Sequence, residues 1–233
     1  MSKYIFVYFF AFVFHFCNGQ NLDVDLQNTR DLFTKNADLS IDIEVFSYTN
    51  ELDKGTKIGV ALLRKSGDLY YSKFLKDEMI LTNNSLIIID HRLKKVKFSE
   101  IKDKSMRFNF LKVNIDSVVN QSDSILYLGI YNNEKKYQFL STQSVYDKVE
   151  LNLDSQSNLL KSITCFYNKG DENMDFTLYK THLNYQKIDT LTKNQSYFLE
   201  ENYVVKNKDR YVLSDKYNTY VLQIVDSKLL PLR

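Results

Sequence analysis

The strongest indication of the architecture lies in residues 79–101, MILTNNSLIIIDHRLKKVKFSEI. Leu86 to Ile89 are four large aliphatic residues in a row, so a strand built from them is apolar on both faces. In an antiparallel sheet with one solvated face, alternate positions along the strand would be polar. Something must therefore cover the second face. One possibility is an ordinary core, in which helices or a second sheet pack on that face. The other is a curved sheet whose concave face encloses an apolar cavity for a ligand.

The residues before this stretch predict short strands joined by tight turns. Ile41, Ile43 and Val45 alternate with acidic residues, which is the period of a half-buried strand. Residues 66–68, Ser-Gly-Asp, predict a hairpin turn with Gly67 at positive φ, and the pair Asn83-Asn84 predicts another turn. About six strands in roughly sixty residues predict an antiparallel meander rather than a parallel sheet.

Two helices and further strands complete the expected pattern. Residues 21–35 place Leu22, Leu26, Thr29 and Phe33 at helical spacing, which predicts an amphipathic helix. A second helix is expected between Phe108 and Val119, and alternating strands resume after it. The segment from 210 to 226 predicts a final hairpin.

The N-terminus has the pattern of a signal peptide. Lys3 precedes an apolar run of 13 residues from Tyr4 to Phe16, which is too short to span a bilayer. Cys17 and Gly19 are small residues at the −3 and −1 positions, so we expect cleavage after Gly19. Residues 1–19 are then the signal peptide and 20–233 a single β-rich domain. As an alternative, Cys17 is a lipidation site.

The charge balance and the cysteine count limit the possible partners and covalent links of the chain. The chain has 31 basic and 29 acidic residues, and this balance argues against nucleic acid as a partner. Cys165 is the one cysteine beyond the predicted signal peptide, so the exported chain has no internal disulfide. We interpret Cys165 as a small core residue rather than a nucleophile.

The sequence contains no recognisable catalytic or metal-binding constellation. His91 lies in a predicted turn and His182 in a predicted strand, and neither has further ligands at the spacing of a metal site. We therefore interpret both histidines as surface residues. No G-x-S-x-G, G-x-G-x-x-G or phosphate-binding loop occurs. These observations predict a protein that is not an enzyme and needs no metal and no cofactor.

Residues 58–101 resemble the LolA/LolB-like superfamily of periplasmic outer-membrane lipoprotein carriers. In NNSLIIIDHRLKKVKF, Asn83-Asn84 stand at the family's turn, Leu86 to Ile89 in its apolar strand and Lys95-Val96 at the position of its Gln-Val pair. His91 replaces the proline of the family's corner. The strands after residue 150 are similar to the family's later strands, and the opening helix is in the expected place.

The resemblance implies a mainly β (α+β) fold, an antiparallel incomplete β-barrel covered by short helices, with an apolar cavity beneath the helices. The residues expected to line this cavity are Leu86, Ile87, Ile88, Ile89, Val60 and Leu62. Arg64 lies where the family's arginine closes the lid by hydrogen bonding to a helix.

The function implied is that of a non-catalytic periplasmic carrier, whose partner is an acylated lipoprotein or another lipid and which contacts a membrane complex transiently. The alternative is an exported accessory module on the same fold that binds a protein partner at the cell envelope. A void between sheet and helices distinguishes the two.

Overall fold

The structure is a computed structural model that describes residues 22–101, 115–142, 144–168, 178–190, 195–208 and 210–226. The predicted signal peptide, residues 1–19, lies outside this part of the chain. Within it, twelve strands form one sheet and two more form a separate two-stranded ribbon. None of the helices in the described ranges has the length and apolar character needed to cross a bilayer.

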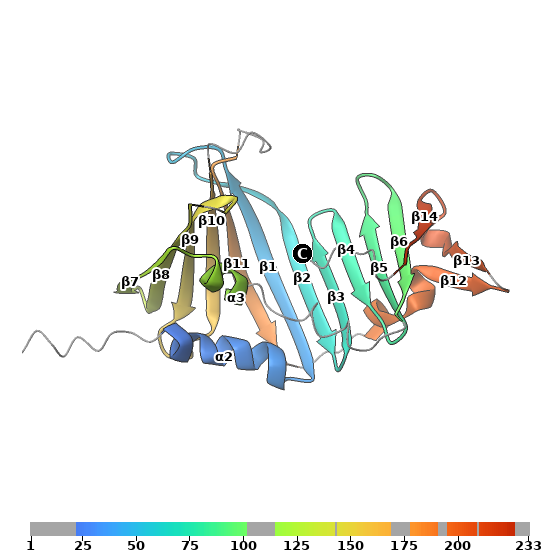
Figure 1. Ribbon diagram of the computed structural model, residues 1–233, viewed down its shortest axis with the longest axis horizontal. Coiled ribbons are helices and arrows are strands. Elements are labelled where there is room, and N and C mark those ends of the chain that lie inside the picture. Colours follow the sequence, from blue (N-terminus) through green and yellow to red (C-terminus); the bar gives the residue numbers. More distant parts are fainter. Residues whose placement is uncertain are drawn as a thin grey trace, which may run out of the picture.

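The large sheet runs in the order β14-β6-β5-β4-β3-β2-β1-β11-β10-β9-β8-β7 (Figure 1). Strands β1 to β6 comprise Asp38–Tyr48, Thr56–Ser66, Leu69–Phe74, Asp77–Leu81, Ser85–Asp90 and Lys95–Glu100. Strands β7 to β11 comprise Ser124–Tyr131, Glu134–Leu140, Tyr146–Asp154, Leu160–Tyr167 and Lys180–Asp189. Consecutive strands from β1 to β6 pair antiparallel, so the predicted meander is confirmed. The predicted turn is also present, with Gly67 at φ +56°.

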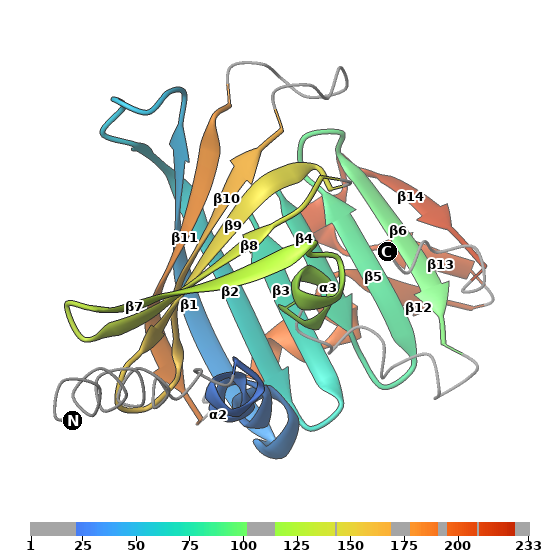
Figure 2. The same cartoon turned by 60° about the vertical axis from the view of Figure 1, so that its left-hand side comes forward.

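The sheet is strongly curved and open, as expected for an incomplete barrel. Figure 2 shows β7 and β8 passing in front of β2 and β3, with α3 beside the right-hand end of β7. We call the face toward the helices the concave face; it carries Ile41, Leu63 and Leu151. The opposite, convex face carries Tyr71, Ile87 and Ile89. The fold is therefore mainly β with a few helices, in agreement with the predicted class.

Two helices cover part of the concave face. Helix α2, Leu22–Lys35, buries Leu26 against β8 and β9, and buries Leu32 and Phe33 against β1. Of the residues predicted to share one side of this helix, Leu26, Thr29 and Phe33 are buried. Helix α3, Ile115–Asn120, packs through Val118 and Val119 on the same core as Leu26. The start of the predicted second helix, residues 108–114, lies outside the described residues.

A group of short C-terminal elements, residues 195–217, covers the convex face of β3 to β6; we call it the C-terminal cap. It consists of η3 (Gln195–Phe198), η4 (Glu200–Asn202), β12 (Val204–Asn207), β13 (Arg210–Leu213) and η5 (Asp215–Tyr217). Its Phe198, Tyr203 and Tyr217 pack against Ile87 and Ile89, both of which are 0% exposed. The cap is thus the element that covers the second face of the apolar strand.

The predicted final hairpin is wrong. Strand β13 pairs with β12 in the cap, whereas β14, Val221–Ile224, pairs in parallel with β6 at the edge of the large sheet. Tight-turn residues predict only sequence-local antiparallel pairs, and a parallel partner more than one hundred residues away gives no such local signal.

Candidate functional site

The centre of the concave face is apolar although it is only partly covered. Half-buried apolar side chains lie there between the two helix-covered cores, from strands on both sides of β1: Ile43, Leu63, Tyr70, Met79, Ile88, Ile163, Cys165 and Tyr185. A sheet face that meets only water ordinarily carries polar residues at such positions. These eight residues form the candidate site.

Three titratable groups of the candidate site respond to its apolar surroundings. Burial raises the pKa of the Tyr70 hydroxyl to about 12 and that of the Cys165 thiol to about 11. Burial also raises the pKa of Tyr185 well above its usual range. Burial disfavours the charged form of each group. The candidate site is therefore a surface that favours apolar atoms over ions, even where it remains accessible.

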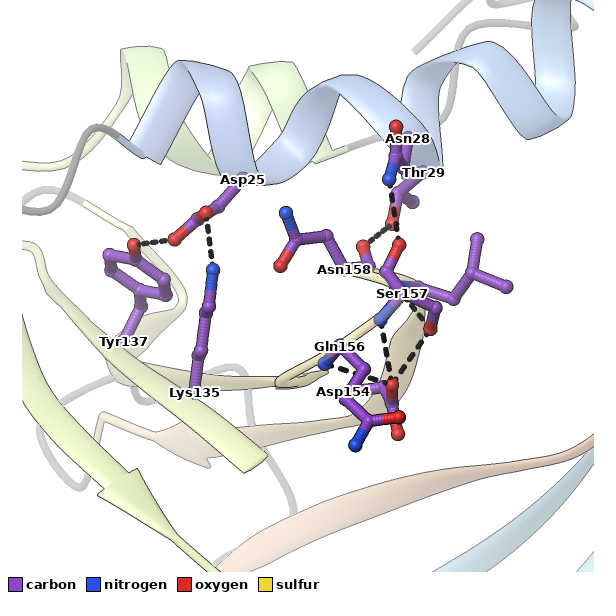
Figure 3. A network of polar contacts seen from close by, with 10 residues as sticks. Asp25, Asn28, Thr29, Lys135, Tyr137, Asp154, Gln156, Ser157 and Asn158 are labelled. Carbon is purple, nitrogen blue, oxygen red and sulfur yellow. Dashed lines mark hydrogen bonds and ion pairs between the residues drawn. The ribbon is translucent and has the colours of Figure 1, made fainter. Parts of the chain in front are cut away.

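Helix α2 is fixed to this face at its N-terminal end by a buried ion pair (Figure 3). Asp25, 4% exposed, accepts a hydrogen bond of 2.7 Å from Nζ of Lys135 and another from the hydroxyl of Tyr137. Lys135 and Tyr137 project from the same face of β8, because they are two residues apart. The helix supplies the carboxylate and the sheet supplies both donors.

The middle of α2 is fixed to the turn between β9 and β10. The amide of Asn28 and the hydroxyl of Thr29 donate to the backbone oxygens of Ser157 and Asn158, at 2.8 and 3.0 Å (Figure 3). Asp154 shapes this turn by accepting hydrogen bonds from the backbone and hydroxyl of Ser157, and these bonds lower the pKa of Asp154. The turn therefore presents its carbonyl groups toward the helix.

The C-terminal end of α2 is held by Lys65 of β2. Its Nζ donates to the backbone oxygens of Phe33 and Asn36, both at 2.8 Å. A cation at these carbonyls is favoured by the helix dipole as well as by hydrogen bonding. Burial lowers the pKa of Lys65. With this contact α2 is attached at three points along its length.

Arg64 lies on the other face of β2 and contacts β1 rather than the helix. Its guanidinium donates to the backbone oxygen of Ile41 and forms an ion pair with Asp42. The role expected for Arg64, a hydrogen bond from strand to helix, is filled by the next residue, Lys65. Residues 64 and 65 point to opposite faces, so a shift of one position exchanges the two roles.

The six residues expected to line a cavity do not share one surface. Leu86 and Ile88 lie on the concave face with Met79 and Tyr70. Ile87 and Ile89 lie under the C-terminal cap, and Leu62 packs against the same cluster. Val60 projects to the same convex side as Leu62 and is 41% exposed. A cavity-lining role therefore stays a prediction for Leu86 and Ile88 alone.

The two histidines are more deeply placed than surface residues. His91 is half-buried and bonds to Glu78 and Tyr220, and His182 is half-buried and bonds to Thr164. Burial lowers the pKa of His182. Within the described ranges, no group of three or more histidine, cysteine or acidic side chains is placed to hold a metal ion.

No protein-family model matches the chain, and no curated protein does. Among solved structures, an uncharacterized conserved protein from Thermus thermophilus is similar with a TM-score of 0.47 and 10% identity, over 88% of this chain and 98% of that one. A LolA superfamily protein from Nitrosomonas europaea is similar with a TM-score of 0.31 and 8% identity, over 76% of this chain and 96% of that one.

The MucA/MucB complex of Pseudomonas aeruginosa contains a chain that is similar with a TM-score of 0.32 and 10% identity, over 72% of this chain and 56% of that one. The Nitrosomonas protein belongs to the superfamily that the sequence resembles. Because these TM-scores lie below 0.5, none of the three structures assigns this chain to a family.

Proposed function

We propose that this protein is a non-catalytic carrier that binds an apolar ligand, such as the acyl chain of a lipid or lipoprotein, on the concave face beside α2 and α3. The observation that carries the proposal is the difference between the two faces of β10. Ile163 and Cys165 are half-buried and project to the half-covered concave face, whereas Ser162 and Thr164 are buried, 6% and 7% exposed, and project to the opposite face. Ile163 and Cys165 are thus apolar residues on a partly accessible face, where contact with water and nothing else would favour polar residues.

The energetics of such a carrier require no reactive group. Each methylene removed from water contributes about 0.8 kcal/mol, so an acyl chain of about 16 carbons gains on the order of 12 kcal/mol when fully enclosed. Partial enclosure by one face of a curved sheet gives a fraction of this value, which suits a ligand that must be released again. Release then needs a receiving site of comparable affinity.

Displacement of a fluorescent fatty acid tests the proposal. Parinaric acid should bind saturably to the purified protein and be displaced by palmitate. Palmitate should also slow the alkylation of Cys165 by a bulky maleimide, followed by mass spectrometry, because the thiol lies on the candidate site. No saturable binding together with unchanged alkylation would contradict the carrier function. The alternative, a module that binds a protein partner, would then explain the fold better.

Export is part of this proposal and is supported by the N-terminal sequence alone. The charged start, the apolar run from Tyr4 to Phe16 and the small residues before Gln20 have the order of a cleaved signal. The intact mass of protein recovered from outside the cytoplasm should correspond to a chain that begins at Gln20. A diacylglyceryl group on Cys17 would instead show membrane anchoring.

A further inference from the structure

Strand β7, Ser124–Tyr131, forms one edge of the large sheet and is unusually apolar for an edge strand. Six of its eight residues are large apolar or aromatic side chains that are between 38% and 56% exposed: Ile125, Leu126, Tyr127, Leu128, Ile130 and Tyr131. The strand contains no charged residue. A long, exposed and apolar edge is a template for pairing with another strand.

The usual protection of an edge strand is weak here. Charged side chains and short strand length ordinarily prevent edge strands from pairing with other chains. The lysines here, Lys135 and Lys136, lie on β8, the next strand inward, and not on the edge strand itself. The opposite edge of the sheet, β14, has four residues and pairs in parallel, so it offers a shorter template. Strand β7 has one protective feature of another kind, an irregularity in its register with β8 between Tyr127 and Gly129.

We propose that β7 is a dimerisation edge, which pairs antiparallel with β7 of a second copy of this chain around a twofold axis. The absence of charge along the strand means that self-pairing brings no like charges together. A twofold, self-complementary interface is also the commonest arrangement for oligomers of one chain.

The charges at the two ends of β7 fit this partner. Asp123 directly precedes the strand, and its carboxylate is oriented by hydrogen bonds from the backbone and hydroxyl of Thr142. At the other end, Nζ of Lys136 lies 5.7 Å from the ring centroid of Tyr131. An antiparallel pair places the Asp123 end of one copy beside the Lys136 end of the other. That end carries Glu134, which pairs with Tyr131, as well as Lys136, so the attraction we propose is specifically between Asp123 of one copy and Lys136 of the other.

Sedimentation velocity over a range of protein concentrations tests the proposal. The unmodified protein should dimerise, and Leu128→Lys should raise the dissociation constant of the dimer about tenfold or more, because each copy then brings a positive charge to the middle of the shared edge. Ile224→Lys places the same charge at a 62% exposed position on β14 and is the matched control; it should leave the dimer intact. Thermal melting of both variants confirms that each is folded.

A charge exchange separates self-pairing from pairing with another protein. Lys136→Glu and Asp123→Lys should each weaken the dimer when alone, and a mixture of the two variants should restore it, because both ends of the mixed pair carry opposite charges. A protein that stays monomeric up to submillimolar concentration would overturn the proposal. A dimer unaffected by Leu128→Lys, or a mixture that does not restore association, would equally overturn it.

Discussion

His91 lies 2.8 Å from Glu78, measured from the imidazole Nε2 to the carboxylate Oε1. Glu78 belongs to β4 and is 6% exposed, so its carboxylate needs partners within the protein. Tyr71 donates to its other oxygen, and Lys73 lies 3.4 Å from Oε1. The second imidazole nitrogen of His91 is 2.8 Å from the hydroxyl of Tyr220, just before β14. This polar group joins the β4–β6 region to the C-terminal segment.

Replacing His91 should therefore weaken the attachment of the C-terminal segment. We expect His91→Ala to lower the free energy of unfolding by about 1–3 kcal/mol, because a buried carboxylate and the Tyr220 hydroxyl both lose a partner. Urea denaturation measures this change. Arg92→Ala, in the same turn at an exposed position, should change stability by less than about 0.5 kcal/mol. Equal effects of the two variants would show that the His91 contacts contribute nothing.

The protein should lose stability at alkaline pH because its tyrosines are buried. Burial raises the pKa of Tyr70 and Tyr146 from 10.0 to about 12, and hydrogen bonding to Glu100 raises that of Tyr211 similarly. Between these values the unfolded chain releases protons that the folded chain retains, so stability present below pH 10 is lost as pH approaches 12.

Tyrosinate absorbance and circular dichroism, recorded together, measure this transition without interference from tryptophan, which the chain lacks. Tyr70→Phe should make the loss of stability less steep between pH 10 and about 12. Ionisation of every tyrosine in one step near pH 10, before any unfolding, would contradict this prediction.

The attachment of α2 should depend on Asp25. Asp25→Asn removes the charge opposite Lys135, whose side chain is only 12% exposed, so we expect a loss of about 3–5 kcal/mol in the free energy of unfolding. Asp31→Asn breaks the exposed pair with Lys35 on the same helix and should cost less than about 1 kcal/mol. Chemical denaturation of both variants measures the difference. Similar losses would show that α2 is not held through Asp25.

Local signals in the sequence predicted those parts of the fold that local contacts determine. The period of 3.6 residues in α2 and the turn with Gly67 concern residues within a few positions of one another, and both are present. The cap over Ile87 and the parallel pairing of β14 with β6 join segments about one hundred residues apart or more, where periodicity carries no information about the partner.

The candidate site shows the same division between local and distant information. The alternation of β5 predicted that neighbouring aliphatic residues face opposite sides, but not which pair meets the helices. For β2, the alternation places Lys65 on the side of Leu63, which packs near Leu39 under α2. That relation could have identified Lys65 rather than Arg64 as the contact to the helix, once the buried side of the strand was known.

The same substitution should destabilise the protein far more at Ile87 than at Ile88, because these adjacent residues lie on opposite faces of β5. Ile87 is 0% exposed under the C-terminal cap and pairs with Phe98, so Ile87→Glu buries a carboxylate without a partner. We expect a loss of more than about 4 kcal/mol, seen as unfolding or a large decrease in melting temperature. Ile88 is half-buried on the candidate site and pairs with the exposed Lys97, which offers the new carboxylate a counter-charge.

Ile88→Glu should therefore remain folded, with a loss below about 2 kcal/mol, while its affinity for parinaric acid falls about tenfold because a charge now stands among the apolar side chains that hold the ligand. Thermal melting and displacement by palmitate, measured on both variants, give the two quantities separately. A folded Ile88→Glu protein that binds parinaric acid as tightly as the unmodified protein would exclude the concave face as the binding surface. If the melting temperature of Ile87→Glu instead equals that of the unmodified protein, the C-terminal cap does not pack on Ile87.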